Sequence, residues 1–128
     1  MTSAAHAYLP LRINWFHILA VLADGDQHGY AIMQQVSERT QNKVRLWPAT
    51  LYGTIKKLLD ADLIIETAED DARRRYYRLT PLGRAVLTAE LGRLRELVNF
   101  VQGYFTNGEG QSTSGFLLKK ELSPLPSP

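Results

Sequence analysis

The stretch PATLYGTIKKLLD at residues 48–60, continued by ADLIIETAEDDARRRYYRLTPLG at residues 61–83, decides the fold. Apolar residues recur in its first part at helical spacing, and Pro48 suits a first helical position, where no N–H bond is needed. The predicted buried stripe is Leu51, Ile55, Leu58 and Leu59. The opposite face carries Ala49, Gly53, Lys56, Lys57 and Asp60. The sequence therefore predicts an amphipathic helix with a partly cationic outer face.

A short β-hairpin is predicted directly after this helix. Leu63–Ile65 and Tyr76–Leu79 are rich in β-branched or aromatic residues and can pair across the polar segment 69–75. That segment ends in three consecutive arginines, Arg73, Arg74 and Arg75. Because successive side chains of a strand alternate between its faces, Arg73 and Arg75 are expected on one side and Arg74 on the other. As an alternative, one arginine pairs with a neighbouring carboxylate of residues 69–71.

Three further helices are predicted. Leu11–Ala23 has helical periodicity and stops at Asp24-Gly25-Asp26, and a second helix runs from about Gly29 to Thr40. Thr80 and Pro81 supply a capping hydroxyl and a first helical residue for the last helix. That helix has an apolar seam at heptad spacing, which favours pairing with another helix. The seam consists of Leu87, Leu91, Leu94, Val98, Val101 and Phe105.

The order of these elements is that of a winged helix-turn-helix. We therefore expect a mainly α fold with a small β-hairpin and a long C-terminal dimerisation helix. The expected organisation is a winged-helix DNA-binding domain over residues 9–80, the dimerisation helix over 81–105 and a flexible tail over 106–128. The tail is expected because glycine, serine, threonine and proline are frequent there. The alternative for the seam is that it packs on the first helix of its own chain.

Composition restricts the class of protein. A chain of 128 residues can form one compact domain with a genuine core. No apolar stretch approaches the ~20 residues that span a bilayer, and the absence of cysteine fits a cytoplasmic protein, so no membrane partner is expected. The net charge is only +2, but ten of the fifteen basic residues fall between Arg39 and Arg84. A local cationic surface of this kind can hold polyphosphate even on a nearly neutral molecule.

These features favour binding to double-stranded DNA. The helix over 48–60 would enter the major groove, where Ala49 and Gly53 permit close approach to base edges and Lys56 and Lys57 donate to phosphates or guanine. The arginines would reach the neighbouring minor groove or backbone. Two alternatives remain at this stage. The lysines could simply be solvated, and the winged helix could be a protein-interaction adaptor, since acidic residues 69–71 beside the arginines would repel phosphate.

Three motifs resemble those of the PadR family of bacterial transcriptional regulators. They are HGY at residues 28–30, PATLY at 48–52 and RRRYYRLTPLG at 73–83, in that family's order and spacing over roughly residues 18–83. The resemblance implies a winged-helix homodimer, usually a repressor, that dimerises through its C-terminal helix. It also implies phosphate contacts by Tyr30, Thr50 and Tyr52, a groove contact by Lys56 or Lys57, and a wing formed by Arg73, Arg74 and Arg75.

The same resemblance implies a ligand site, because some members bind flat aromatic compounds between the dimerisation helix and the first helix. Trp15, Phe16, Leu91 and Leu94 match that region, although an apolar stripe can equally be ordinary core. The chain departs from the family at two positions. Asp70-Asp71-Ala72 stands where glycine commonly precedes the arginines, and Trp47 occupies a cap position usually held by Ser, Asn or Asp.

Catalytic patterns find little support. The three histidines lie in different contexts, and no nucleophile–histidine–acid set or glycine-rich phosphate loop can be assembled. Asp24-x-Asp26-x-His28 could be a metal site, but a polar turn between two helices explains it better. We therefore expect neither an enzyme nor a cofactor.

Overall fold

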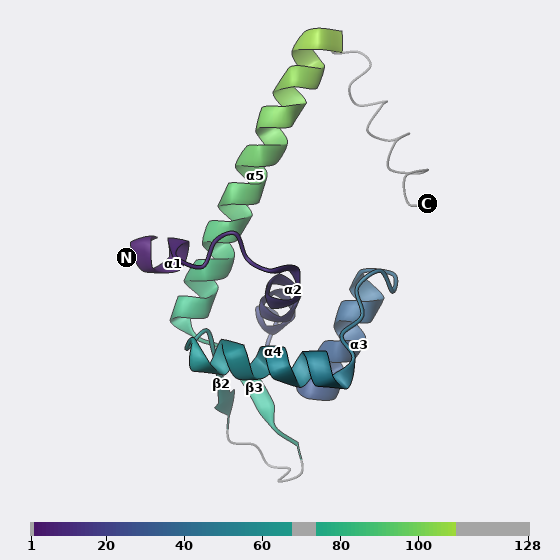
Figure 1. Cartoon of the computed structure of the whole chain (residues 1–128), viewed down its shortest axis with the longest axis vertical. Helices are drawn as coiled ribbons and strands as arrows, with labels where there is room; N and C mark the ends of the chain where they lie inside the picture. Colours follow the sequence, from purple (N-terminus) through teal and green to yellow (C-terminus); the bar gives the residue numbers. More distant parts are fainter. Residues whose placement is uncertain (1, 68–73, 110–128) are drawn as a thin grey trace. The chain divides into compact units, whose positions relative to one another are not determined.

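The computed structural model describes residues 2–67 and 74–109. Its elements follow one another as α1 (Thr2–His6), α2 (Ile13–Leu22), β1 (Gln27–His28), α3 (Gly29–Arg39), α4 (Pro48–Asp60), β2 (Ile64–Thr67), β3 (Tyr76–Leu79) and α5 (Pro81–Glu109) (Figure 1). The chain divides into two compact units, residues 1–91 and 92–128, which we call the first and second units. The first unit is a winged helix, and the mainly α fold with a long C-terminal helix is confirmed.

The core of the first unit lies between α2, α3 and α4. Ile18, Ile32 and Leu51 contribute one fully buried side chain from each of these helices. The predicted inner face of α4 is confirmed for Leu51, Ile55 and Leu58, whereas Leu59 is only partly buried. This burial fixes the rotation of α4 about its axis, because the residues opposite the stripe must then face outward.

The sheet has three strands rather than the two of the predicted hairpin. Its order is β1-β3-β2, and both pairings are antiparallel. In the wing, Ile64 pairs with Leu79 and Thr67 with Tyr76. The additional strand, β1, pairs Gln27 with Tyr77 and His28 with Tyr76. It joins the start of α3 directly to the wing.

Three helix boundaries can be compared with their predictions. Trp47 precedes α4 without a side-chain hydrogen bond, as its lack of an acceptor predicts. The N–H of Gly83 donates to Oγ1 of Thr80 at 2.9 Å, which confirms the predicted cap of α5. α5 extends to Glu109, four residues beyond the predicted end at 105.

Within the described residues, no helix has both the length and the apolar character needed to cross a membrane.

Leu87 differs from the rest of the predicted α5 seam. Its side chain is only 8% exposed and belongs to the core of the first unit. Its own chain therefore covers it, which corrects its assignment to a surface available for pairing. Leu91, Val98, Val101 and Phe105 remain exposed, and Leu94 is half-buried.

Candidate nucleic-acid interface

The outward face of α4 is a shallow ridge of small side chains with cations beside it. Ala49, Gly53, Lys56 and Lys57 are all exposed, as predicted. A Cβ added at Gly53 would meet no atom within 4 Å, so the ridge is open at its centre. Nζ of Lys56 lies 3.3 Å from Oδ2 of Asp60 in an exposed pair, which contributes little to stability and can exchange for another anion. Lys57 forms no ion pair with any described residue.

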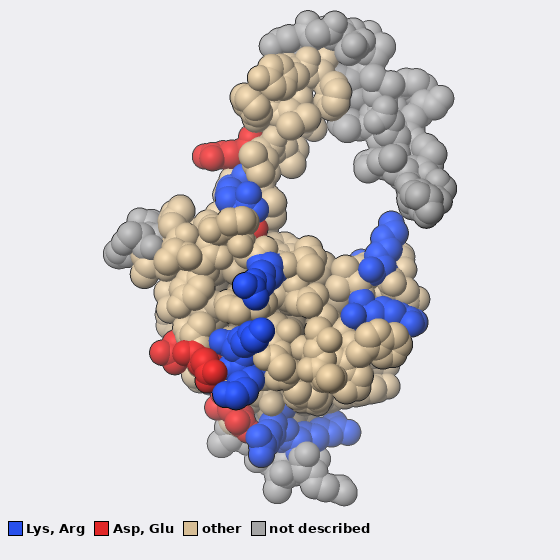
Figure 2. Space-filling model, viewed as in Figure 1, with Lys and Arg blue, Asp and Glu red and all other residues tan. Residues whose placement is uncertain are grey.

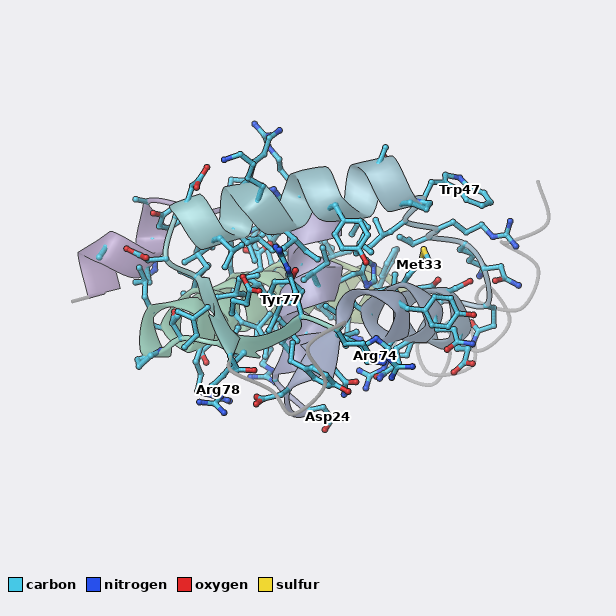
Figure 3. The ribbon with its side chains drawn as sticks, turned by 90° about the horizontal axis from the view of Figure 1, so that it is seen from below. Asp24, Met33, Trp47, Arg74, Tyr77 and Arg78 are labelled. Carbon is cyan, nitrogen blue, oxygen red and sulfur yellow. The ribbon has the colours of Figure 1, made fainter. Side chains whose placement is uncertain are left out.

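One side of this ridge faces the wing. Tyr52 of α4 lies over Gly29 at the start of α3, and Tyr30 and the base of the wing border the same space. Arg74 and Tyr77, labelled in Figure 3, border it from the wing. We call this space the wing-side pocket. It is lined by His28, Gly29, Tyr30, Tyr52, Arg74, Arg75 and Tyr77. Tyr77 is only 4% exposed, and burial raises the pKa of its hydroxyl, so it stays a neutral hydrogen-bonding group.

The position of Tyr52 depends on the glycine beneath it. A Cβ added at Gly29 would lie 2.8 Å from Cζ of Tyr52, closer than real Cβ contacts allow. Gly29 therefore lets the tyrosine ring lie directly over the first turn of α3. Because Tyr52 is 51% exposed, its ring could move away if that space were filled.

The wing arginines have different partners. Nη1 of Arg74 lies 3.3 Å from Nε2 of His28, at the edge of the wing-side pocket. Nε of Arg75 lies 3.5 Å from Oε2 of Glu66 across the hairpin, in an exposed pair. The prediction of opposite sides assumed strand geometry, but Arg74 and Arg75 precede β3, and both line the wing-side pocket. Arg73 and the acidic residues 69–71 lie outside the described residues.

The other side of the ridge faces the start of α2. Here Arg12 and Asn14 approach Thr50 and Lys57 of α4, and together they line a polar groove of about 280 Å³. We call it the Arg12 groove; Trp15, Gly53 and Thr54 complete its lining. Arg12 directly precedes α2, and its backbone is extended. Sequence reasoning missed Arg12 and Asn14, since no pattern marks an isolated cation in front of a helix.

The charge of this surface is asymmetric. In Figure 2, lysine and arginine side chains lie over α4 and continue onto the wing below it, whereas the acidic side chains near α4 lie at one edge. Two acidic residues of the α2–β1 turn are paired with arginines: Asp24 with Arg39 at 3.1 Å, and Asp26 with Arg78 at 2.8 Å. The hydrogen bond from Arg78 lowers the pKa of Asp26. These pairs favour the interpretation of the Asp24–His28 segment as a polar turn rather than a metal site.

The second unit presents apolar side chains of α5. Val98, Val101 and Phe105 of the predicted seam are exposed there, and so are Leu97, Phe100 and Tyr104, which the heptad pattern did not include. The predicted aromatic-ligand site stays a prediction, because Leu94 belongs to this unit and its other residues to the first. Trp15 and Phe16 are partly buried against the core of the first unit.

Comparison with known proteins gives a consistent result. Residues 18–89 match the model of the transcriptional regulator PadR-like family. The transcriptional regulator Rv3488 of Mycobacterium tuberculosis is 39% identical over 99 residues, which cover 76% of this chain and 90% of that protein. The crystal structure of a PadR family transcription regulator from hypervirulent Clostridium difficile is 28% identical, with a TM-score of 0.61 over 73% of this chain and 98% of that one. A transcriptional regulator from Clostridium thermocellum is also 28% identical, with a TM-score of 0.60 over 73% of this chain and 91% of that one.

Proposed function

The chain belongs to the PadR-like family of transcriptional regulators, and from this membership and the geometry around α4 we propose that it is a homodimeric, sequence-specific repressor. In this proposal α4 enters the major groove of operator DNA, and the wing rests on the neighbouring backbone. Two such domains bind two half-sites separated by whole turns of about 10 bp and block access to a promoter. The family is one of regulators rather than enzymes.

One observation carries the proposal: the ridge of α4 has a cationic, hydrogen-bonding recess on each side. The Arg12 groove lies on one flank and the wing-side pocket on the other. The major groove, about 12 Å wide, likewise has a phosphate backbone on each side of its base edges. A helix with small residues at its crest and donors on both flanks therefore matches the shape and charge of that groove. This arrangement supports DNA as the partner rather than a protein, because binding to a protein would not require donors on both flanks of α4.

Removing either cation of the Arg12 groove should weaken binding and its dependence on salt. Arg12→Ala and Lys57→Ala are each expected to lower operator affinity about ten-fold and to reduce the slope of log K against log salt by about one. The operator would be selected from random duplex DNA, and affinity measured by fluorescence anisotropy at several salt concentrations. Arg39→Ala is the control, because that arginine pairs with Asp24 away from both recesses. Salt slopes that stay unchanged in both variants would contradict the proposed surface.

The contact between Gly29 and Tyr52 gives a second test. Gly29→Ala should displace the Tyr52 ring from the wing-side pocket and weaken operator binding about ten-fold, the free-energy equivalent of one charge-assisted hydrogen bond. Its thermal stability should change little, because an exposed ring can move. In a Tyr52→Ala chain the same replacement should cost nothing further, since the displaced group is already absent. An equal loss in both backgrounds would mean that Gly29 acts by another route.

A planar aromatic effector that releases the repressor completes the proposal. Its support is the partly buried pair Trp15 and Phe16, together with the exposed Leu91 at the end of the first unit. Titration of planar aromatic compounds against tryptophan fluorescence would detect binding near Trp15. A ligand that quenches this fluorescence should also lower operator affinity in the anisotropy assay. A broad screen without quenching would count against an effector.

A further inference from the structure

His28 has a hydrogen-bond donor at each of its two ring nitrogens. The backbone N–H of Ala31 donates to Nδ1 at 3.1 Å, which makes His28 the N-cap of α3. On the other side of the ring, Nη1 of Arg74 lies 3.3 Å from Nε2. The ring itself is held in place by this cap and by an edge-on contact with Tyr76, whose ring centre is 5.3 Å away.

An imidazole cannot accept from both of these donors. The neutral ring has one nitrogen lone pair in its plane, and a guanidinium has only N–H donors. The N–H of Ala31 belongs to the first turn of α3 and has no partner within the helix, so it takes the lone pair of Nδ1. In the tautomer that accepts this cap bond, the proton of the ring is on Nε2. Nε2–H and Nη1 of Arg74 are then two donors 3.3 Å apart, and no described residue supplies an acceptor between them.

We propose that His28 and Arg74 form a clamp for one oxygen of a DNA backbone phosphate at the mouth of the wing-side pocket. This proposal rests on the proposed function, and it adds a recognition residue, His28, together with the position of its proton. An oxygen between the two donors would accept from both, which turns an unfavourable contact into a charge-assisted one. Tyr30 and Tyr52 line the same pocket, so their side chains border the space that the phosphate would enter.

The protonation state of His28 agrees with this role. Burial, and then the charge of Arg74, lower the pKa of its ring. At neutral pH the ring is therefore uncharged, so it can cap α3 through Nδ1 and still donate through Nε2. Arg75 is not equivalent to Arg74, because Glu66 already faces it. The clamp thus combines one neutral donor and one charged donor, and the two should respond differently to salt.

This difference defines the experiment. Asparagine is a good N-cap, so His28→Asn should keep the bond to Ala31 but lose the distant donor. We expect it to melt within a few degrees of the unmodified chain, to bind the operator about ten-fold more weakly, and to keep the same salt slope. Arg74→Gln should weaken binding to a similar extent and reduce the salt slope by about one. The double variant should lose less than the two single losses combined, because both residues hold one oxygen.

The phosphate can be located on the DNA itself. Operator duplexes carrying one uncharged methylphosphonate at successive backbone positions should include one position that weakens the unmodified chain but costs His28→Asn and Arg74→Gln little. Absence of any such position, or unchanged binding by both variants, would overturn the clamp. If Arg12→Ala and Lys57→Ala still weaken binding in that case, the proposed function stands without it. If His28→Asn unfolds, Arg74→Gln and the methylphosphonate scan decide alone, because Arg74 lies on the exposed wing.

Discussion

Replacing Gly83 by alanine is expected to destabilise the folded chain by about 3 kcal/mol, the upper end of the usual cost of overpacking. Gly83 lies in the first turn of α5, where an added Cβ would be 3.0 Å from the carbonyl carbon of Leu63 and closer still to its oxygen. That oxygen also accepts the N–H of Thr80 at 3.1 Å. The obstacle is thus backbone, held by its own hydrogen bond, and it cannot move aside as a flexible side chain would.

A second glycine of the same helix provides the matched control. Gly92 is exposed, and a Cβ there would meet no atom within 4 Å. Gly92→Ala should therefore stabilise α5 by up to about 1 kcal/mol, the difference in helix propensity between the two residues. Urea denaturation followed by circular dichroism would measure both variants. A loss below about 1 kcal/mol for Gly83→Ala, against the overpacking range of about 1–3 kcal/mol, would show that the backbone at Leu63 moves aside easily.

The sequence predicted those parts of the fold whose side-chain pattern repeats over several turns. The faces of α4 followed from Leu51, Ile55 and Leu58, since an apolar stripe at helical spacing must face a core. β1 could not be predicted in this way, because Gln27 and His28 are too few to show an alternating pattern. Its existence depends on pairing with Tyr76 and Tyr77, which are distant in the chain.

The candidate site likewise contains residues that a repeating pattern predicts and residues that only tertiary packing brings together. Exposed residues of α4 were predictable, because they are the complement of its buried stripe. Arg12 was not, because only the packing of α2 against α4 brings it beside Lys57. The contact between His28 and Arg74 likewise requires the β1–β3 pairing. The one available signal was local: His28 stands immediately before a predicted helix, where an accepting side chain is expected at the cap.

The apolar surface of α5 in the second unit is wider than the predicted seam. Six side chains there are between 46% and 64% exposed: Leu97, Val98, Phe100, Val101, Tyr104 and Phe105. The rings of Phe100 and Tyr104 are in edge-on contact, with their centres 4.9 Å apart, and they form a row beside the heptad positions. A seam for a single partner helix needs only two residues per heptad, so this surface is wide enough to contact more than one helix. We therefore expect it to be covered in a dimer, as contiguous exposed apolar patches usually mark interfaces.

Val101→Glu should separate such a dimer, because it places a charge in the middle of the apolar surface without a partner. Operator affinity is then expected to fall roughly 100-fold or more, since each monomer holds only one half-site and each additional 1.4 kcal/mol lost costs a factor of ten. Asn99→Glu introduces the same charge on the polar side of α5 and should leave mass and affinity unchanged. Light scattering at micromolar concentration would report the mass, and anisotropy the affinity.

A dimer that persists in Val101→Glu would place the pairing surface elsewhere. A monomer that still binds the full operator as tightly as the unmodified chain would mean that dimerisation contributes nothing to recognition. The two measurements therefore test separately whether α5 mediates dimerisation and whether the dimer is the DNA-binding form.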